Sequence, residues 1–182
     1  MMKFSELIIE RQSVRKYIDK AVEKEKLIRC LEAARLAPSA SNAQPWKFIV
    51  VDDPELKEKV AKETYSMIAT FNKFVHQAPV IIVITLEKPT LVNRIGGRIK
   101  KKEWKLIDVG IAAEHLCLQA TEEGLSTCML GWYNEKEAKE LLNIPEKKSI
   151  ALMISLGYAP EDYKQREKIR KSIDEIVSFN SY

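Results

Sequence analysis

The strongest apolar runs in the chain have the length of buried β-strands. Residues 80–86 (VIIVITL) are apolar nearly throughout, and residues 47–51, 127–132 and 149–156 are further runs of apolar and β-branched side chains. Apolar runs of four to eight residues are typical of strands that are covered on both faces. We therefore predict strands over these ranges.

Between the strands, apolar residues recur at helical spacing. Residues 23–36 carry one apolar stripe, and residues 106–123 form the longest segment of this kind, rich in alanine and leucine. Because the residue before a proline avoids the helical region, Pro38 ends the first segment. Gly124 supplies the glycine stop of the second. Both segments are therefore predicted helices.

Capping signals predict the remaining helices. Residues 4–10 form a short amphipathic helix, and the Asp-Pro pair at 53–54 opens a helix that we expect to run toward Phe71. Asn134 and Ser172 are expected N-caps of two later helices. Since strands and helices mix without strict alternation, the predicted fold class is α+β.

The composition is that of a globular protein. The chain has 182 residues, 46% of them hydrophobic and 31% charged, which suits a single domain with its own core. The formal net charge of +4 is too small to indicate a nucleic-acid partner. A small basic nucleic-acid-binding module remains the third hypothesis, but the basic residues are scattered and no series of aromatic residues accompanies them.

Cysteine and histidine usage argues against a metal centre. Cys30, Cys117 and Cys128 are widely spaced, and the only histidines are His76 and His115. We therefore expect no zinc site and no disulfide framework. No histidine is near Cys128 in sequence, so we interpret that thiol as structural.

No apolar run is long enough to span a membrane, and we expect a soluble cytoplasmic protein.

Two segments in the first third of the chain are candidates for ligand binding. In Arg11-Gln-Ser-Val-Arg15, two guanidinium groups from one loop suit a phosphate or another anion, although a solvated basic turn is the alternative. Residues 37–46 (APSASNAQPW) place Asn42 and Gln44 in one short loop, and amides suit the edge of a flat heterocycle. The alternative is a structural loop with Asn42 in the left-handed region and Trp46 in the core.

Two later segments add to these candidates. Gly131 lies at the end of a predicted strand, where it allows close approach of a ligand to the backbone. Lys168, Arg170 and Lys171 form a basic cluster before a predicted helix N-terminus. A solvated charged tail is the alternative for this cluster.

Taken in order, these segments resemble the nitroreductase-like, FMN-dependent oxidoreductase family. The similarity rests on R-x-S-x-R, on A-P-S-A-S-N-A-Q-P-W, on T-C-M-L-G-W and on the closing R-K-S-x-x-E-I-V, so it covers nearly the whole chain. It implies a three-layer α+β fold, with a central mixed, mainly antiparallel sheet flanked by helices. It also implies a homodimer with FMN at the interface.

The resemblance also implies which residues bind FMN. They are Arg11, Gln12, Ser13, Arg15, Asn42, Gln44, Leu130, Gly131, Lys168, Arg170 and Lys171. The arginine motif and the C-terminal cluster would meet the phosphate and the ribityl chain, and Asn42 would come from the partner subunit. Leu130 stands where an acidic residue is also found, so only the backbone there would face the flavin.

The implied activity is ping-pong hydride transfer from NADH or NADPH, through FMN, to a small-molecule acceptor such as a nitro compound or a quinone. Because the cofactor carries the hydride, no catalytic acid–base pair is required. The second hypothesis is a flavoprotein of the same fold with other redox chemistry, namely desaturation, dehalogenation or flavin handling. Residues 88–105 are basic and form either a substrate lid or a solvated turn.

Overall fold

The sheet at the centre of the molecule is antiparallel. A computed structural model describes residues 2–87 and 103–182. Within them, β1 (Trp46–Val51), β2 (Val80–Leu86), β4 (Ile150–Gly157) and β3 (Ser126–Leu130) form one sheet in the order β1-β2-β4-β3. A parallel bridge between Ser13 and Thr127 adds the N-terminal segment beside β3 and makes the pairing mixed.

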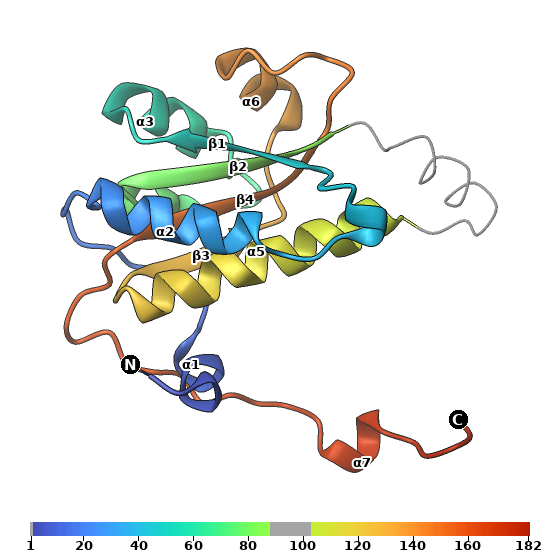
Figure 1. Ribbon diagram of the computed structural model, residues 1–182. Coiled ribbons are helices and arrows are strands. Elements are labelled where there is room, and N and C mark those ends of the chain that lie inside the picture. The colour runs from blue at the N-terminus through green and yellow to red at the C-terminus, as the bar shows by residue number, and fades with distance from the viewer. Residues whose placement is uncertain (1, 88–102) are drawn as a thin grey trace.

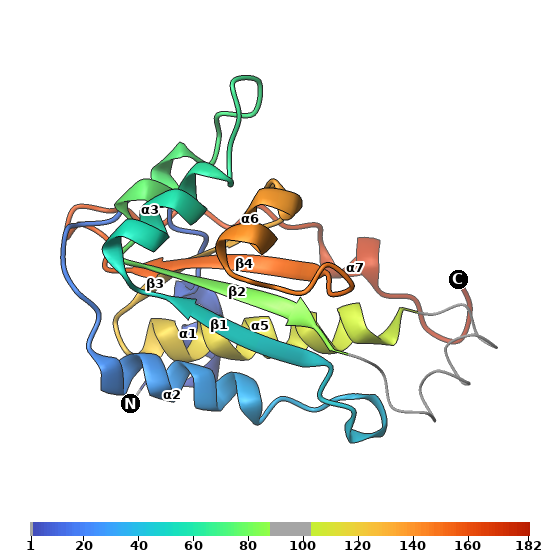
Figure 2. The same cartoon turned by 90° about the horizontal axis from the view of Figure 1, so that it is seen from above.

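Helices cover both faces of this sheet, which gives the predicted three-layer α+β fold (Figure 1 and Figure 2). On one face lie α2 (Lys24–Arg35) and α5 (Trp104–Glu122). The other face carries α3 (Pro54–Lys62), η2 (Lys73–Gln77) and α6 (Glu135–Leu141). The side chains of β2 point alternately into the two apolar clusters, which explains why its whole sequence is apolar.

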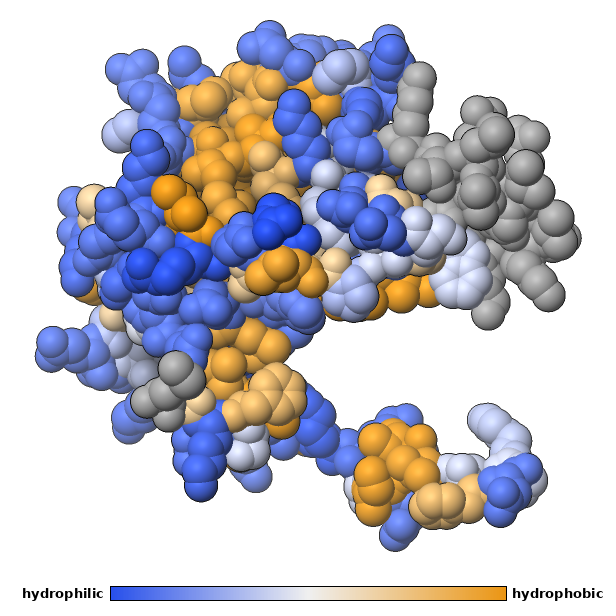
Figure 3. Space-filling model, viewed as in Figure 1, coloured by the Kyte–Doolittle hydropathy of each residue, from blue (hydrophilic) through white to orange (hydrophobic). Residues whose placement is uncertain are grey.

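Three short helices lie outside these layers. α1 (Phe4–Glu10) lies beside α5, and η1 (Ala40–Asn42) lies near the start of α5 (Figure 1). α7 (Ile173–Ile176) begins with the predicted capping box of Ser172 and Glu175. The segment that carries α7 projects from the body of the molecule, and a gap separates it from α5 (Figure 3).

Two predicted boundaries are wrong. The helix that begins at Pro54 ends at Lys62 and does not run toward Phe71. There the Thr64 hydroxyl donates to the Ala61 carbonyl (2.7 Å), and Asn72 donates to the Thr64 carbonyl (3.0 Å), so tertiary hydrogen bonds replace the helical ones. Similarly, β3 ends at Leu130 because Asn72 also binds the carbonyl of Trp132 (3.2 Å), which takes that residue away from the sheet.

The described residues include no helix that is long and apolar enough to cross a membrane. Within the same residues, no cluster of three or more histidine, cysteine, aspartate or glutamate side chains has the arrangement of a metal site. The predicted lid falls mainly on residues 88–102, which lie outside the described residues.

Candidate functional site

The arginine motif runs in extended form along the edge of β3. Val14 N donates to the Thr127 carbonyl (2.9 Å), and the side chains of Val14 and Tyr17 are buried. Whereas Val14 packs in the core, the side chains of Arg11, Ser13 and Arg15 line one cavity, so the motif presents two guanidinium groups and a hydroxyl together.

The C-terminal segment lies across this motif. Lys168 Nζ donates to the Arg11 carbonyl (2.5 Å), and the Tyr163 hydroxyl accepts from Arg15 N (3.1 Å).

Arg166 adds further contacts between the two segments. The side-chain oxygen of Gln12 accepts from Arg166 N (3.2 Å), and an Arg166 guanidinium nitrogen donates to the Ser13 carbonyl. Segments about 150 positions apart are therefore joined into one site.

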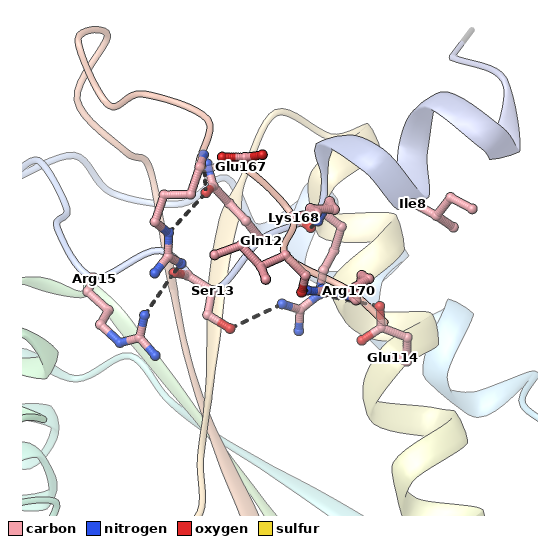
Figure 4. Close-up of a pocket in the computed structure, with 11 residues that line it drawn as sticks. Ile8, Gln12, Ser13, Arg15, Glu114, Glu167, Lys168 and Arg170 are labelled. Atoms are coloured by element: carbon pink, nitrogen blue, oxygen red, sulfur yellow. Dashed lines mark hydrogen bonds and ion pairs between the residues drawn. The ribbon is translucent and has the colours of Figure 1, made fainter. Parts of the chain in front are cut away.

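A cavity of about 580 Å³ lies between the two segments (Figure 4). It is lined by Ile8, Arg11, Gln12, Ser13, Arg15, Glu114, Arg166, Glu167, Lys168, Ile169 and Arg170. Five of these side chains are cationic and two are carboxylates, so the cavity is positively charged. Its volume lies in the range of small-molecule sites, about 300–1,000 Å³.

Arg11 has unused hydrogen-bonding capacity in this cavity. Its side chain is only 12% exposed, and its Nε lies 3.3 Å from Glu114 Oε1. That contact lacks the geometry of a hydrogen bond, and the buried Nε has no hydrogen-bond partner among the described residues. One terminal nitrogen donates a long bond to Ser13 Oγ (3.4 Å). A buried N–H without a partner is costly, so the chemistry of this site suits an incoming anion.

The loop with Asn42 and Gln44 adopts a strained backbone. Ser41, Asn42 and Gln44 have φ values of 52°, 50° and 44°, in the left-handed region. Gln44 Nε2 donates to Asn42 Oδ1 (3.0 Å), so the two amides form a pair. The alternative interpretation is therefore confirmed in its geometry, with Asn42 in the left-handed region and Trp46 buried.

This loop does not line the arginine cavity of its own chain. It lies near the N-terminal end of α5 (Figure 1), whereas the cavity is lined by Ile8 of α1 and by the arginine motif. One chain thus brings Arg11, Gln12, Ser13, Arg15, Lys168 and Arg170 together but leaves Asn42 and Gln44 apart from them. Lys171 is exposed and does not line the cavity either.

Leu130 and Gly131 lie at the end of β3, beyond the bridge to Ser13. The Leu130 side chain is buried in the core, so only its backbone is offered to a ligand. A Cβ built on Gly131 meets no described atom within 4 Å, so the space above that backbone is open.

Burial raises the pKa of the neighbouring Cys128 thiol, and the Arg15 charge offsets this only in part, which agrees with an unreactive thiol.

Sequence reasoning missed five lining residues, Ile8, Glu114, Arg166, Glu167 and Ile169. Arg166 had a detectable signal, because it precedes Lys168 and Arg170 with the same spacing of two. Glu114 carries no signal in the sequence, since its place in the cavity results only from the packing of α1 against α5.

Comparison with known proteins identifies the family. The model of the nitroreductase family matches residues 8–71 and 66–158, which is most of the chain. The chain belongs to the nitroreductase family. An FMN-dependent nitroreductase structure from Clostridium difficile R20291 is similar to this nitroreductase-family chain, with 32% identity and a TM-score of 0.78. The match covers 97% of this chain and 98% of that one.

Two curated relatives show the range of activities among similar proteins. An oxygen-insensitive NADPH nitroreductase from Helicobacter acinonychis is 28% identical over 93% of this chain and 94% of its own length. An iodotyrosine deiodinase from Thermotoga neapolitana is 27% identical over 97% of each chain. This nitroreductase-family protein is therefore an oxidoreductase in class, and its relatives differ in substrate.

Proposed function

We propose that this protein is an FMN-dependent oxidoreductase that takes hydride from NADH or NADPH and reduces nitro compounds, quinones or similar acceptors. The observation that carries the proposal is the cationic cavity, in which two distant segments bring five positive side chains together. A flavin phosphate is a dianion whose oxygens accept hydrogen bonds from guanidinium groups. FMN supplies the hydride chemistry when bound.

In this proposal the chain's own residues bind and orient the cofactor. Arg11, Ser13, Lys168 and Arg170 hold the phosphate and the ribityl chain, with Gln12 beside them, and the unpartnered Nε of Arg11 supports that role. Lys171 remains a further proposed phosphate contact. Arg15 is the candidate for a fixed positive charge beside the flavin.

The ring of the cofactor is proposed to meet the end of β3. The absence of a side chain at Gly131 leaves room for a flat heterocycle close to the backbone. The N–H groups of Leu130 and Gly131 are the proposed donors to the flavin edge. Since the Leu130 side chain is buried, substitution there acts through packing and not through a lost polar group.

We further propose that the working unit is a homodimer, in which Asn42 and Gln44 of a second copy complete the site. Support comes from the exposed apolar side chains of the C-terminal segment, which projects from the body (Figure 3). These are Ile169, Ile173, Ile176, Val177, Phe179 and Tyr182. Exposed apolar surface of this kind often marks an interface, and a two-fold arrangement gives two equivalent sites.

All described cysteines are free, as in the reducing cytoplasm that we propose for the protein.

The purified protein tests the proposed function. We expect a flavin absorption band and, under nitrogen, bleaching of that band by NADH or NADPH and recovery on adding a nitroaromatic or a quinone. Light scattering should show a dimer. A colourless protein that takes up no added FMN would contradict the proposed cofactor, and a monomer that binds FMN tightly would contradict the dimer.

Reductive dehalogenation is the second candidate function. It is favoured by the similarity to an iodotyrosine deiodinase along nearly the full length of both chains. An iodinated phenol in the acceptor panel separates the two candidates: release of iodide favours dehalogenation, and turnover of only nitro compounds and quinones favours the first proposal.

A further inference from the structure

Glu114 is an acidic residue inside a cavity that is otherwise suited to an anion. It lies in the middle of α5, and its Oε1 is 3.3 Å from Arg11 Nε. The Arg11 side chain is 12% exposed, whereas that of Glu114 is 44% exposed. The arginine is therefore held by the fold, but the carboxylate has room to turn toward solvent.

The contact between the two side chains is loose. Arg11 Nε makes no hydrogen bond with any described residue, so Glu114 neutralises the charge without satisfying the donor. The Cys117 thiol is also close to Arg11, but burial raises its pKa and it adds no charge. Glu114 is thus the anionic group that pairs with Arg11 within the described structure.

We propose that Glu114 competes with the ligand phosphate for Arg11 and thereby sets the affinity of the site for phosphorylated ligands. This inference rests on the proposed function, because it takes the FMN phosphate as the incoming anion. With the cavity empty, Glu114 pairs with Arg11. When a phosphate enters, its oxygens accept from the guanidinium donors, and Glu114 moves out to solvent.

The competing role makes an unusual prediction, namely that removing a cavity residue improves binding. Glu114→Gln removes the competing charge and its repulsion of the dianion. A partly exposed ion pair contributes about 0.2–1 kcal/mol, so FMN affinity should rise about 1.4- to fivefold. Riboflavin has no phosphate, and its affinity should stay unchanged.

The chain offers a matched control in Glu167, which lines the same cavity without an ion pair to Arg11. Glu167→Gln makes the same change of charge, so it measures the general electrostatic effect alone. The gain in FMN affinity should be larger for Glu114→Gln than for Glu167→Gln. Glu114→Ala, which has no side-chain acceptor, should shift the affinity in the same direction as Glu114→Gln.

The experiment is a titration of flavin-free protein with FMN and with riboflavin, followed by quenching of flavin fluorescence. Tighter FMN binding in Glu114→Gln and Glu114→Ala, with riboflavin binding unchanged, supports the inference. Equal or weaker FMN binding, or the same change with riboflavin or in Glu167→Gln, overturns it while leaving FMN binding itself intact. A wild-type protein that binds no FMN overturns the proposed function as well, so the two failures are distinguishable.

Discussion

The carboxylate of Asp108 accepts a hydrogen bond from the backbone N–H of Ala40, with 3.1 Å between Oδ1 and the nitrogen. Asp108 is 4% exposed on α5. Ala40 begins the loop in which Ser41, Asn42 and Gln44 have positive φ. Strained backbone of this kind persists only where its surroundings hold it in place. A buried side chain on the longest described helix thus fixes the loop that carries both candidate amides.

Replacing Asp108 should therefore loosen this loop. Asp108→Ala removes this hydrogen bond, and a hydrogen bond to a charged group contributes about 1.5–3 kcal/mol to the free energy of unfolding. Asp108→Asn keeps a side-chain oxygen and should cost less. Urea unfolding measures both variants, with hydrogen exchange at residues 40–44 as a local readout. Equal stability of Asp108→Ala and the wild type would show that the bond does not hold the loop.

A second prediction concerns the buried hydroxyl of Tyr17. It contacts Ser155 Oγ (2.9 Å) and donates toward the Val14 carbonyl (3.1 Å), which connects the arginine motif to β4. Tyr17→Phe leaves the buried Ser155 hydroxyl without this partner and should cost about 1–3 kcal/mol in urea unfolding. A Tyr17→Phe variant that is as stable as the wild type would show that this hydroxyl does not stabilise the fold.

Stability should fall in acid partly through Glu123. Its carboxylate pairs with Arg29 (2.6 Å between Oε1 and Nε), and this hydrogen bond holds the pKa of Glu123 below the usual 4.5. A lowered folded-state pKa gives stability that is present above pH 4.5 and lost as the pH falls through the folded value. The Tm difference between wild type and Arg29→Gln should therefore shrink from pH 7 to pH 3. A difference that is constant with pH would contradict this.

The thiols should be unreactive in the native protein. Burial raises the pKa of Cys30 to about 12 and also raises the pKa of Cys117 and Cys128. Since the thiolate is the reactive form, Ellman's reagent at pH 8 should label all three cysteines slowly in buffer and rapidly in denaturant. Fast labelling of Cys128 in the folded protein would overturn its interpretation as structural.

The sequence predicts an element best where local pattern and tertiary environment agree. Residues 80–86 form a strand with the predicted limits because β2 is central and buried on both faces. The helix from Pro54 ends early because Asn72, ten residues beyond its last residue, binds the Thr64 carbonyl. No local pattern encodes that contact.

The candidate site follows the same rule. Arg11, Ser13 and Arg15 were predicted because they are close in sequence, and the structure places all three around one cavity. Glu114 was missed because a single glutamate on a long helix carries no signal until α1 packs against α5. Asn42 and Gln44 remain apart from the cavity of one chain, so their role depends on the proposed second copy.

The contribution of the ligand phosphate tests the central claim most directly. The measurement is the ratio of FMN affinity to riboflavin affinity in the wild type and in Arg11→Ala, with Lys136→Ala on α6 as a control for the loss of a cation elsewhere. If the arginine cavity binds the phosphate, loss of a charge-assisted contact worth about 1.5–3 kcal/mol should lower the ratio about 10- to 100-fold in Arg11→Ala alone. An unchanged ratio in Arg11→Ala would contradict the account, because the phosphate would then be bound elsewhere.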